Sequence, residues 1–339
     1  MLNKEITHKF LSRFPIFYSV LLVAALLVLG FLAGWWIRGS TQQADTNEQV
    51  AIRESGYRLV KPLLIGMVQN SYDQPFKSLE AKFREMKFNA TNNPEVNAVS
   101  VYFLDLTSAH SMGIKEDDLY DSGSLLKVSI LIAALKEAES QPGFLNKKVI
   151  YPYGAQDDQV QHNLKPGNAY TIEELLRFMI IQSDNPAKDL LFASVDRNFV
   201  NDVFVKLGLP VPDPNSQYKI SARMYSYFFR VLYNSTYLHK KDSEWIMELL
   251  SQAAYKDGLV AGVPQDVTVA HKFGLDTGVS VGNGNNNVWE LHDCGIVFHP
   301  DNPYFLCVMT RGQDLTQLTN VIKVTSQVIY QEVDKNFNN

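Results

Sequence analysis

The longest apolar run of the chain lies near its N-terminus. Residues 14–37 contain no charged residue, and as a helix with ~1.5 Å rise per residue this run spans ~36 Å, enough to cross the apolar core of a bilayer. Basic residues are more frequent before the run, within residues 1–13, than after it, where only Arg38 follows closely. Because positive charge favours the cytoplasmic side, the pattern predicts a cytoplasmic tail, a transmembrane anchor at residues 14–37 and an exported remainder.

A cleaved signal peptide is the competing interpretation of this run. The run is longer than the apolar part of a signal peptide, and Leu32-Ala33-Gly34 is followed by two tryptophans rather than by a cleavage site. We therefore expect the anchor to remain attached to the chain.

Polar residues at 38–48 predict a short linker after the anchor. Helical periodicity of apolar positions follows over residues 49–70 and 76–88. These two segments predict a helical N-terminal extension at residues 49–94, packed on a main domain at residues 95–339.

The main domain alternates between strand and helix patterns. Runs of β-branched and aromatic residues predict strands at 97–106, 267–273, 288–298 and 304–310. Residues 125–135 are apolar nearly all round, which is typical of a central helix. The chain from there to about residue 255 is predicted to be mostly helical, and a last helix is predicted over 315–333. Strands at both ends of a helical middle predict an α/β (α+β) layer with an inserted all-helical lobe.

Composition is that of an ordinary globular protein. The chain has 339 residues, of which 46% are hydrophobic and 20% charged, so it can bury a sizeable core. Its formal net charge of -5 offers no basic surface for a phosphate backbone. We therefore expect no nucleic-acid partner.

The chain has two cysteines, Cys294 and Cys307, on two strands that are expected to be neighbours. An exported domain permits disulfides, but a cross-strand bridge is geometrically demanding, so we favour buried free thiols and leave the bridge open. Neither cysteine has the spacing of a zinc site, and no metal is expected.

The first candidate for chemistry is Ser124-Leu125-Leu126-Lys127. Its hydroxyl and amine lie three residues apart, hence on one face of a helix. Asp121-Ser122-Gly123 resembles a helix start, so the amide of Ser124 can donate to a developing oxyanion. A lysine in an apolar helix loses its proton easily and can then deprotonate the serine. On its own, the pair is explained more simply by a lysine that extends to solvent.

Two further elements add polar side chains. Ser183-Asp184-Asn185 precedes Pro186, which places the triplet in a tight connection between two helices. Lys272 and Gly274 share one face of a strand, where small residues allow an extended ligand to approach the backbone. Each element has an ordinary alternative, a turn cap for the triplet and a solvated strand lysine for Lys272.

Together and in this order, the three elements resemble the serine β-lactamase and penicillin-binding superfamily, most closely its class A branch. The resemblance spans about residue 95 to the end. It implies a β-lactamase/transpeptidase-like fold, with an antiparallel sheet flanked by helices and an all-helical lobe. It also implies a bacterial hydrolase, outside the cytoplasmic membrane, that forms an acyl-enzyme with a β-lactam or a D-alanyl peptide of peptidoglycan type and needs no cofactor.

The resemblance assigns roles residue by residue. The implied catalytic residues are the nucleophile Ser124, its general base Lys127 and the proton relay Ser183. The implied substrate-binding residues are Asn185, which donates to the substrate amide, the cation Lys272, Gly274, and Leu275, whose amide completes an oxyanion hole with that of Ser124.

Two departures from the family pattern bear on function. Phe273 stands where the family has Thr or Ser, and losing that hydrogen bond costs ~1.5–3 kcal/mol, or ~10- to 100-fold in ligand recognition, unless Thr277 or Ser280 substitutes. The family's Glu-x-x-Leu-Asn loop is also missing, because residues 208–218 offer only Asp213. Without a positioned base, hydrolysis of the acyl-enzyme slows by ~10²–10⁴-fold.

Other candidate bases are more simply explained as a turn acid or a packed histidine. They are Asp213, Asp276, His271 and His292. The alternative to slow hydrolysis is a non-catalytic binder or cell-wall scaffold that retains the fold. Phe273 favours this alternative, whereas the presence of all three motifs argues against it.

Overall fold

The computed structural model describes residues 22–30, 52–65, 77–90, 95–152, 164–213, 215–280 and 287–337. The chain forms two units, residues 1–50 with 68–71 and residues 51–67 with 72–339. In the first unit, residues 22–30 form a helix. None of the helices in the described ranges is long and apolar enough to cross a membrane. Most of the expected anchor at 14–37, the tail at 1–13 and the linker at 38–48 lie outside the described residues.

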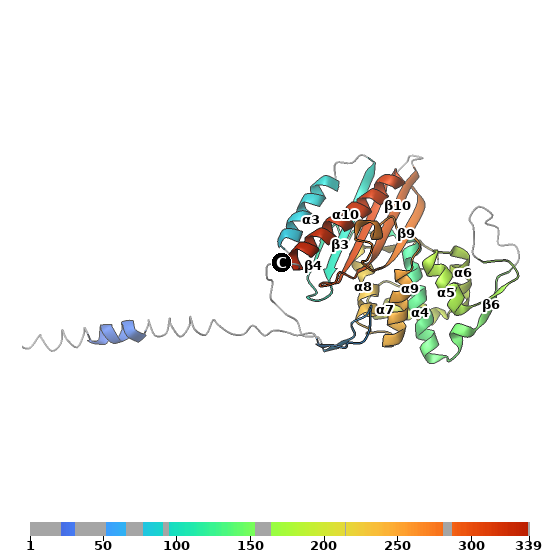
Figure 1. Ribbon diagram of the computed structural model, residues 1–339, viewed down its shortest axis with the longest axis horizontal. Helices are drawn as coiled ribbons and strands as arrows, with labels where there is room; N and C mark the ends of the chain where they lie inside the picture. Colours follow the sequence, from blue (N-terminus) through green and yellow to red (C-terminus); the bar gives the residue numbers. More distant parts are fainter. Residues whose placement is uncertain are drawn as a thin grey trace, which may run out of the picture. The chain divides into compact units, whose positions relative to one another are not determined.

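A five-stranded antiparallel sheet forms one layer of the second unit (Figure 1). Its strand order is β4 (Ser111–Ile114), β3 (Val96–Asp105), β11 (Tyr304–Gly312), β10 (Asn287–Val297) and β9 (Val269–Ser280). The four predicted strands are therefore confirmed, and β4 is an additional short strand that pairs with β3. β9 is an edge strand, so one side of its backbone is left for other contacts.

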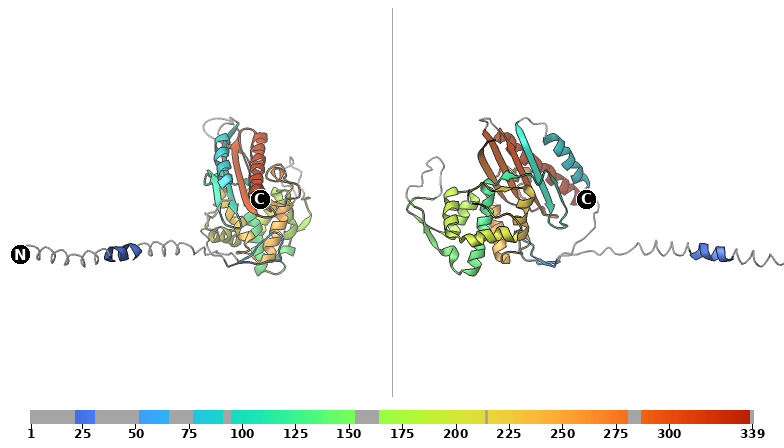
Figure 2. Two further views of the ribbon diagram at one scale, coloured as in Figure 1. Left: turned by 60° about the vertical axis from the view of Figure 1, so that its left-hand side comes forward. Right: turned by 180° about the vertical axis from the view of Figure 1, so that it is seen from behind.

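Two terminal helices cover one face of the sheet. Figure 2 shows α3 (Lys77–Ala90) and α10 (Leu315–Phe337) lying along it. Leu79 of α3 and Ile322 of α10 are fully buried in one cluster with the strands. α10 begins as expected, because the carboxylate of Asp314 accepts the first free amides of the helix.

A helical lobe lies on the other side of the sheet. It contains α4 (Lys127–Ser140), α5 (Ile172–Ile181), α6 (Asn185–Ser194), α7 (Arg197–Lys206), α8 (Ala222–Tyr233) and α9 (Lys240–Ser251). Ten of the 14 residues of α4 are buried, as the apolar sequence of a central helix requires. The rings of Phe229 on α8 and Phe305 on β11 lie 5.3 Å apart, which joins the lobe to the sheet. The predicted helical lobe is therefore confirmed, but it is not all-helical, because β6 (Lys148–Ile150) pairs with β7 (Ala169–Thr171) between α4 and α5. A further short pair, β5 (Tyr120–Asp121) with β8 (Lys219–Ile220), precedes η1 (Gly123–Leu126) and α8.

The helix expected at residues 49–70 was wrong over the described part of that segment. Two short paired strands, β1 (Ile52–Arg53) and β2 (Leu63–Ile65), stand there instead. Pro62 cannot donate a helical hydrogen bond, and the carboxylate of Glu244 on α9 accepts three backbone amides of the loop between the strands. Tertiary contact therefore overrides the local periodicity. The division between an extension at 49–94 and a domain at 95–339 stays a prediction.

The preference for free thiols was also wrong. Cys294 on β10 stands directly opposite Cys307 on β11, and the two form a disulfide. The strand register, which sequence spacing alone did not fix, brings the sulfurs together.

Removing this disulfide should destabilise the domain. A bridge that closes a loop of this length contributes ~3 kcal/mol by restricting the unfolded chain. We expect the paired variant Cys294→Ala and Cys307→Ala to lose ~2–3 kcal/mol of unfolding free energy, measured by denaturant titration. Free thiol in the denatured, unreduced wild type would contradict the bridge.

Candidate active site

The site forms where the edge strand β9 meets the short 3-10 helix η1 (Gly123–Leu126). Gly123 has φ +48°, and a Cβ on it would lie 3.0 Å from the carbonyl oxygen of Leu275. A Cβ on Gly274 would lie 3.0 Å from the carbonyl oxygen of Ser122. Two glycines therefore allow the strand backbone to lie against the turn that carries Ser124.

Ser124 lies on η1, directly before α4. The sequence predicted the first turn of one continuous helix, and the structure has a 3-10 turn that passes into α4 at Lys127. Ser124 is half-buried, and its hydroxyl forms no hydrogen bond within the described part of the chain. The amide nitrogen of Leu275 lies 3.4 Å from the Cβ position of Gly123. An acyl group on Ser124 would thus have a second backbone amide close by.

Lys127 is buried at the start of α4 and points its amine at the connection between α5 and α6. The amine donates to the carbonyl oxygen of Ser183 at 2.5 Å, to its hydroxyl at 3.1 Å and to Oδ1 of Asn185 at 2.8 Å. Burial, with a smaller effect of the nearby Lys188 cation, lowers the pKa of Lys127 to about 8. Part of the population is therefore neutral near physiological pH.

The α5–α6 connection holds Ser183 in an unusual backbone conformation. Ser183 has φ +58°, in the left-handed region. The side chain of Asp184 accepts the amide of Ala187 at 2.8 Å and so caps α6. Pro186 was expected to keep Asn185 out of a helix, but α6 begins at Asn185 with the proline in its first turn.

Lys272 on β9 is fully buried, so the alternative of a solvated strand lysine was wrong. Its amine donates to the hydroxyl of Ser183 at 2.9 Å and to the carbonyl oxygen of Phe273 at 2.9 Å. Burial first, and then the charge of Lys127, lower the pKa of Lys272 well below its ordinary value, while Asp293 opposes the shift.

The hydroxyl of Ser183 is therefore the meeting point of two amines. A hydroxyl oxygen has two acceptor sites and one proton. Because the amines of Lys127 and Lys272 both donate to this oxygen, the proton of Ser183 must point away from them. That geometry suits a group that hands a proton to a ligand.

A buried carboxylate holds the segment before η1. Glu290 on β10 accepts the amide of Asp121 at 2.7 Å and the Nε of Arg311 at 2.5 Å. His292 contacts the carbonyl oxygen of Asp121 at 3.0 Å. Burial opposes ionisation, but hydrogen bonds with His292 and Arg311 lower the pKa of Glu290 overall. Glu290 and Arg311 were not predicted as functional residues, because the register that sets them opposite each other on β10 and β11 is known only from the sheet.

The other candidate bases serve structural roles. His271 pairs with Asp293 at 2.7 Å inside the protein, and His292 packs against the ring of Tyr120. Asp213 accepts an amide of its own turn, and Asp276 contacts Gln217. Among the residues that the structure describes, none of the four hydrogen-bonds to Ser124 or Lys127.

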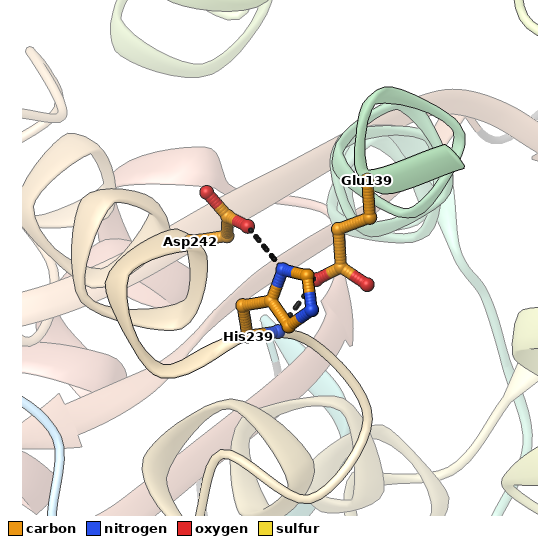
Figure 3. Close-up of side chains that lie close together, drawn as sticks. All are labelled: Glu139, His239 and Asp242. Carbon is orange, nitrogen blue, oxygen red and sulfur yellow. Dashed lines mark hydrogen bonds and ion pairs between the residues drawn. The ribbon is translucent and has the colours of Figure 1, made fainter. Parts of the chain in front are cut away.

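One cluster has side chains of the type that binds metals. Figure 3 shows Glu139 at the end of α4 beside His239 and Asp242 at the start of α9. Glu139 accepts the backbone amide of His239 at 2.5 Å and pairs with Lys136 at 2.9 Å. These contacts hold the start of α9 against the end of α4, and the cluster lies ~18 Å along α4 from Lys127.

Most of the chain matches one family of known proteins. Residues 79–333 match a family model described as the β-lactamase enzyme family. A β-lactamase of Streptomyces albus G is 26% identical over 238 residues, which cover 62% of this chain and 72% of that protein.

Solved structures show the same fold. PBP-A superposes with a TM-score of 0.66 and 20% identity, covering 78% of this chain and 98% of its own. A variant of PBP-A, solved as an acyl-enzyme complex with penicillin G, gives 0.65 and 20%, covering 76% and 97%. The predicted β-lactamase/transpeptidase-like fold is therefore confirmed.

Loss of Glu290 should loosen the segment before Ser124. Removing one partner of a buried ion pair costs ~3–5 kcal/mol, so we expect Glu290→Ala to lower the unfolding free energy by about that amount in denaturant titration. Glu85→Ala removes a carboxylate from an exposed pair with Lys82 and should cost under ~0.5 kcal/mol. Equal losses in both variants would contradict the role of Glu290.

Proposed function

The chain belongs to the β-lactamase enzyme family, and on that premise we propose that it is a serine hydrolase that becomes acylated on Ser124. The proposed substrates are a β-lactam or a D-alanyl peptide of peptidoglycan type. A variant of PBP-A, with the same fold, was solved as an acyl-enzyme complex with penicillin G, which is the kind of product proposed here. The supporting observation is the convergence of Lys127 and Lys272 on the hydroxyl of Ser183.

In the proposed acylation, neutral Lys127 takes the proton of Ser124. The hydroxyl oxygen attacks the carbonyl carbon of the substrate, and the amides of Ser124 and Leu275 stabilise the negative charge that develops on the carbonyl oxygen. The C–N bond then breaks, and Ser183 gives its proton to the leaving nitrogen and is reprotonated from a neighbouring lysine amine. Every proton transferred comes from a side chain of the chain itself.

Lys127 must redirect its amine for this reaction. At rest it donates to Ser183 and Asn185 and forms no hydrogen bond with Ser124 in the described residues. Catalytic hydrogen bonds are often incomplete before substrate binds. A substrate amide that accepts a hydrogen bond from Asn185 and reorients its side chain would release one of the three contacts of the Lys127 amine and free the amine to turn.

We propose that release of the acyl group is slow. No carboxylate within the described ranges forms an ion pair or hydrogen bond with Lys127, and Asp213 is occupied by its own turn. Activation of water by a positioned base contributes ~10²–10⁴-fold. The family's glutamate has no counterpart in residues 208–218.

We also propose that the domain lies outside a bacterial cytoplasmic membrane, attached by residues 14–37. The uncharged run and the excess of basic residues before it support this assignment. The disulfide between Cys294 and Cys307 is consistent with an oxidising compartment.

A non-catalytic binder is the second candidate. The observation that favours it is the ring of Phe273, whose centroid lies 4.3 Å from the amine of Lys272. A binder would keep the fold and bind its ligand without a covalent step.

Mass spectrometry of the intact chain after incubation with benzylpenicillin separates the two candidates. We expect a mass increase equal to one penicillin on Ser124, persisting for many minutes because deacylation lacks a base. Ser124→Ala should abolish it. Folded wild-type protein that stays unmodified both with benzylpenicillin and with its methyl ester would support the binder.

The acylation rate should rise with pH through about 8. The pKa of Lys127 is lowered to about 8, and the amine acts as a base when neutral, so the active form accumulates above that pH. Adduct formation measured between pH 6 and 10 tests this profile.

The variant Lys188→Gln tests whether this pH profile reports the pKa of Lys127. Its cation contributes to the lowered pKa of Lys127, so its removal should move the inflection to higher pH. A rate that falls with pH, or an inflection that moves to lower pH in this variant, would contradict Lys127 as the base.

A further inference from the structure

Phe273 changes the surroundings of the Lys272 amine. The amine is fully buried, and its two hydrogen bonds go to Ser183 and to the carbonyl oxygen of Phe273. The Phe273 ring lies over the same amine with its centroid at 4.3 Å. A substrate carboxylate therefore cannot reach this amine unless the ring moves.

Tyr255 supports the ring of Phe273. Tyr255 lies beyond the end of α9, and the two rings are stacked with centroids 4.5 Å apart and planes inclined by 28°. Both residues are half-buried, so each keeps exposed aromatic surface. We call this pair, Phe273 and Tyr255, the aromatic wall.

The aromatic wall lies beside the reacting groups. The amine of Lys272 contacts both the ring of Phe273 and the hydroxyl of Ser183, at 4.3 Å and 2.9 Å. A substrate whose leaving nitrogen approaches Ser183 must therefore present its neighbouring group to the ring. Phe273 supplies no hydroxyl to that group, and the cation behind it is hidden.

The surface of the aromatic wall disfavours an anion. The face of an aromatic ring carries partial negative charge, and a carboxylate that loses water without gaining a hydrogen bond pays a large desolvation cost. An uncharged group gains from burial against the same rings. The aromatic wall thus favours an uncharged group over a carboxylate, whereas a site with an accessible lysine and hydroxyl favours the carboxylate.

We propose that the site selects substrates that carry an uncharged or apolar group, rather than a carboxylate, next to the bond that is broken. This inference rests on the proposed function and narrows its substrates to those β-lactams and D-alanyl peptides in which the neighbouring carboxyl group is blocked. Such substrates include amides and esters whose neighbouring acid is blocked.

A matched pair of probes tests the inference. Benzylpenicillin and its methyl ester share the β-lactam ring and differ in the charge of the neighbouring carboxyl group. We expect the full-length wild type to be acylated at least ~10-fold faster by the ester than by the acid, measured as adduct formation on Ser124 by mass spectrometry.

Phe273→Thr restores the hydroxyl and uncovers Lys272. The ratio of ester to acid rates should fall by ~10- to 100-fold in this variant. Phe192→Thr makes the same change at an exposed aromatic of α6 and should leave the ratio unaltered. If Phe273→Thr does not fold, Phe273→Leu tests the same point, with a smaller fall in the ratio.

The outcomes separate the two proposals. Adducts that form on Ser124 with the same ratio in wild type and in the folded Phe273 variant overturn the substrate inference alone. Absence of any adduct on Ser124 from both probes overturns the proposed function and the inference with it.

Discussion

Two buried lysine amines share one serine hydroxyl, and the rest of the site is arranged around this contact. Lys127 on α4 and Lys272 on β9 both donate to the oxygen of Ser183. Two full positive charges at this separation in a poorly solvated place repel each other strongly. Burial lowers the pKa of both lysines, and the charge of Lys127 lowers that of Lys272 further. A proton is thus easily lost from one amine, and the proton of Ser183 is left for a ligand.

Such a contact requires three separate segments to be held rigidly. α4 brings Lys127 from the interior of the helical lobe, the α5–α6 connection holds Ser183 in the left-handed region, and β9 brings Lys272 from the sheet. The glycines at 123 and 274 permit close approach of β9 to η1. Glu290 on β10 holds the segment before η1 by accepting the amide of Asp121. The stability of the scaffold and the geometry of the site therefore depend on the same contacts.

The sequence predicted much of this arrangement, and the failures have physical reasons. Strands and helices with long periodic patterns were correct, and so was the resemblance carried by the motifs at Ser124, Ser183 and Lys272. The helix expected at 49–70 does not form because Glu244, 184 and 185 residues away in sequence, accepts the amides of Val60 and Leu59. The expectation of free thiols was wrong because the register that places Cys294 opposite Cys307 is set by the whole sheet. Lys272 is buried where η1 packs on β9 and Ser183 approaches from the α5–α6 connection, and no local sequence pattern reports such long-range contacts.

The proposed reaction divides into two halves that the site serves unequally. Attack and cleavage need a base, a proton relay and amide donors, and Lys127, Ser183 and the amides of Ser124 and Leu275 offer all of these. Hydrolysis of the resulting ester needs an additional acceptor for the proton of water, and no carboxylate in the described ranges hydrogen-bonds to Ser124 or Lys127. Phe273 further removes the hydroxyl that would recognise a carboxylate and covers the lysine behind it. The missing glutamate and the presence of Phe273 are therefore compatible with each other. In the proposed reaction, a long-lived acyl-enzyme needs no rapid activation of water, and a substrate without a carboxylate needs no accessible lysine.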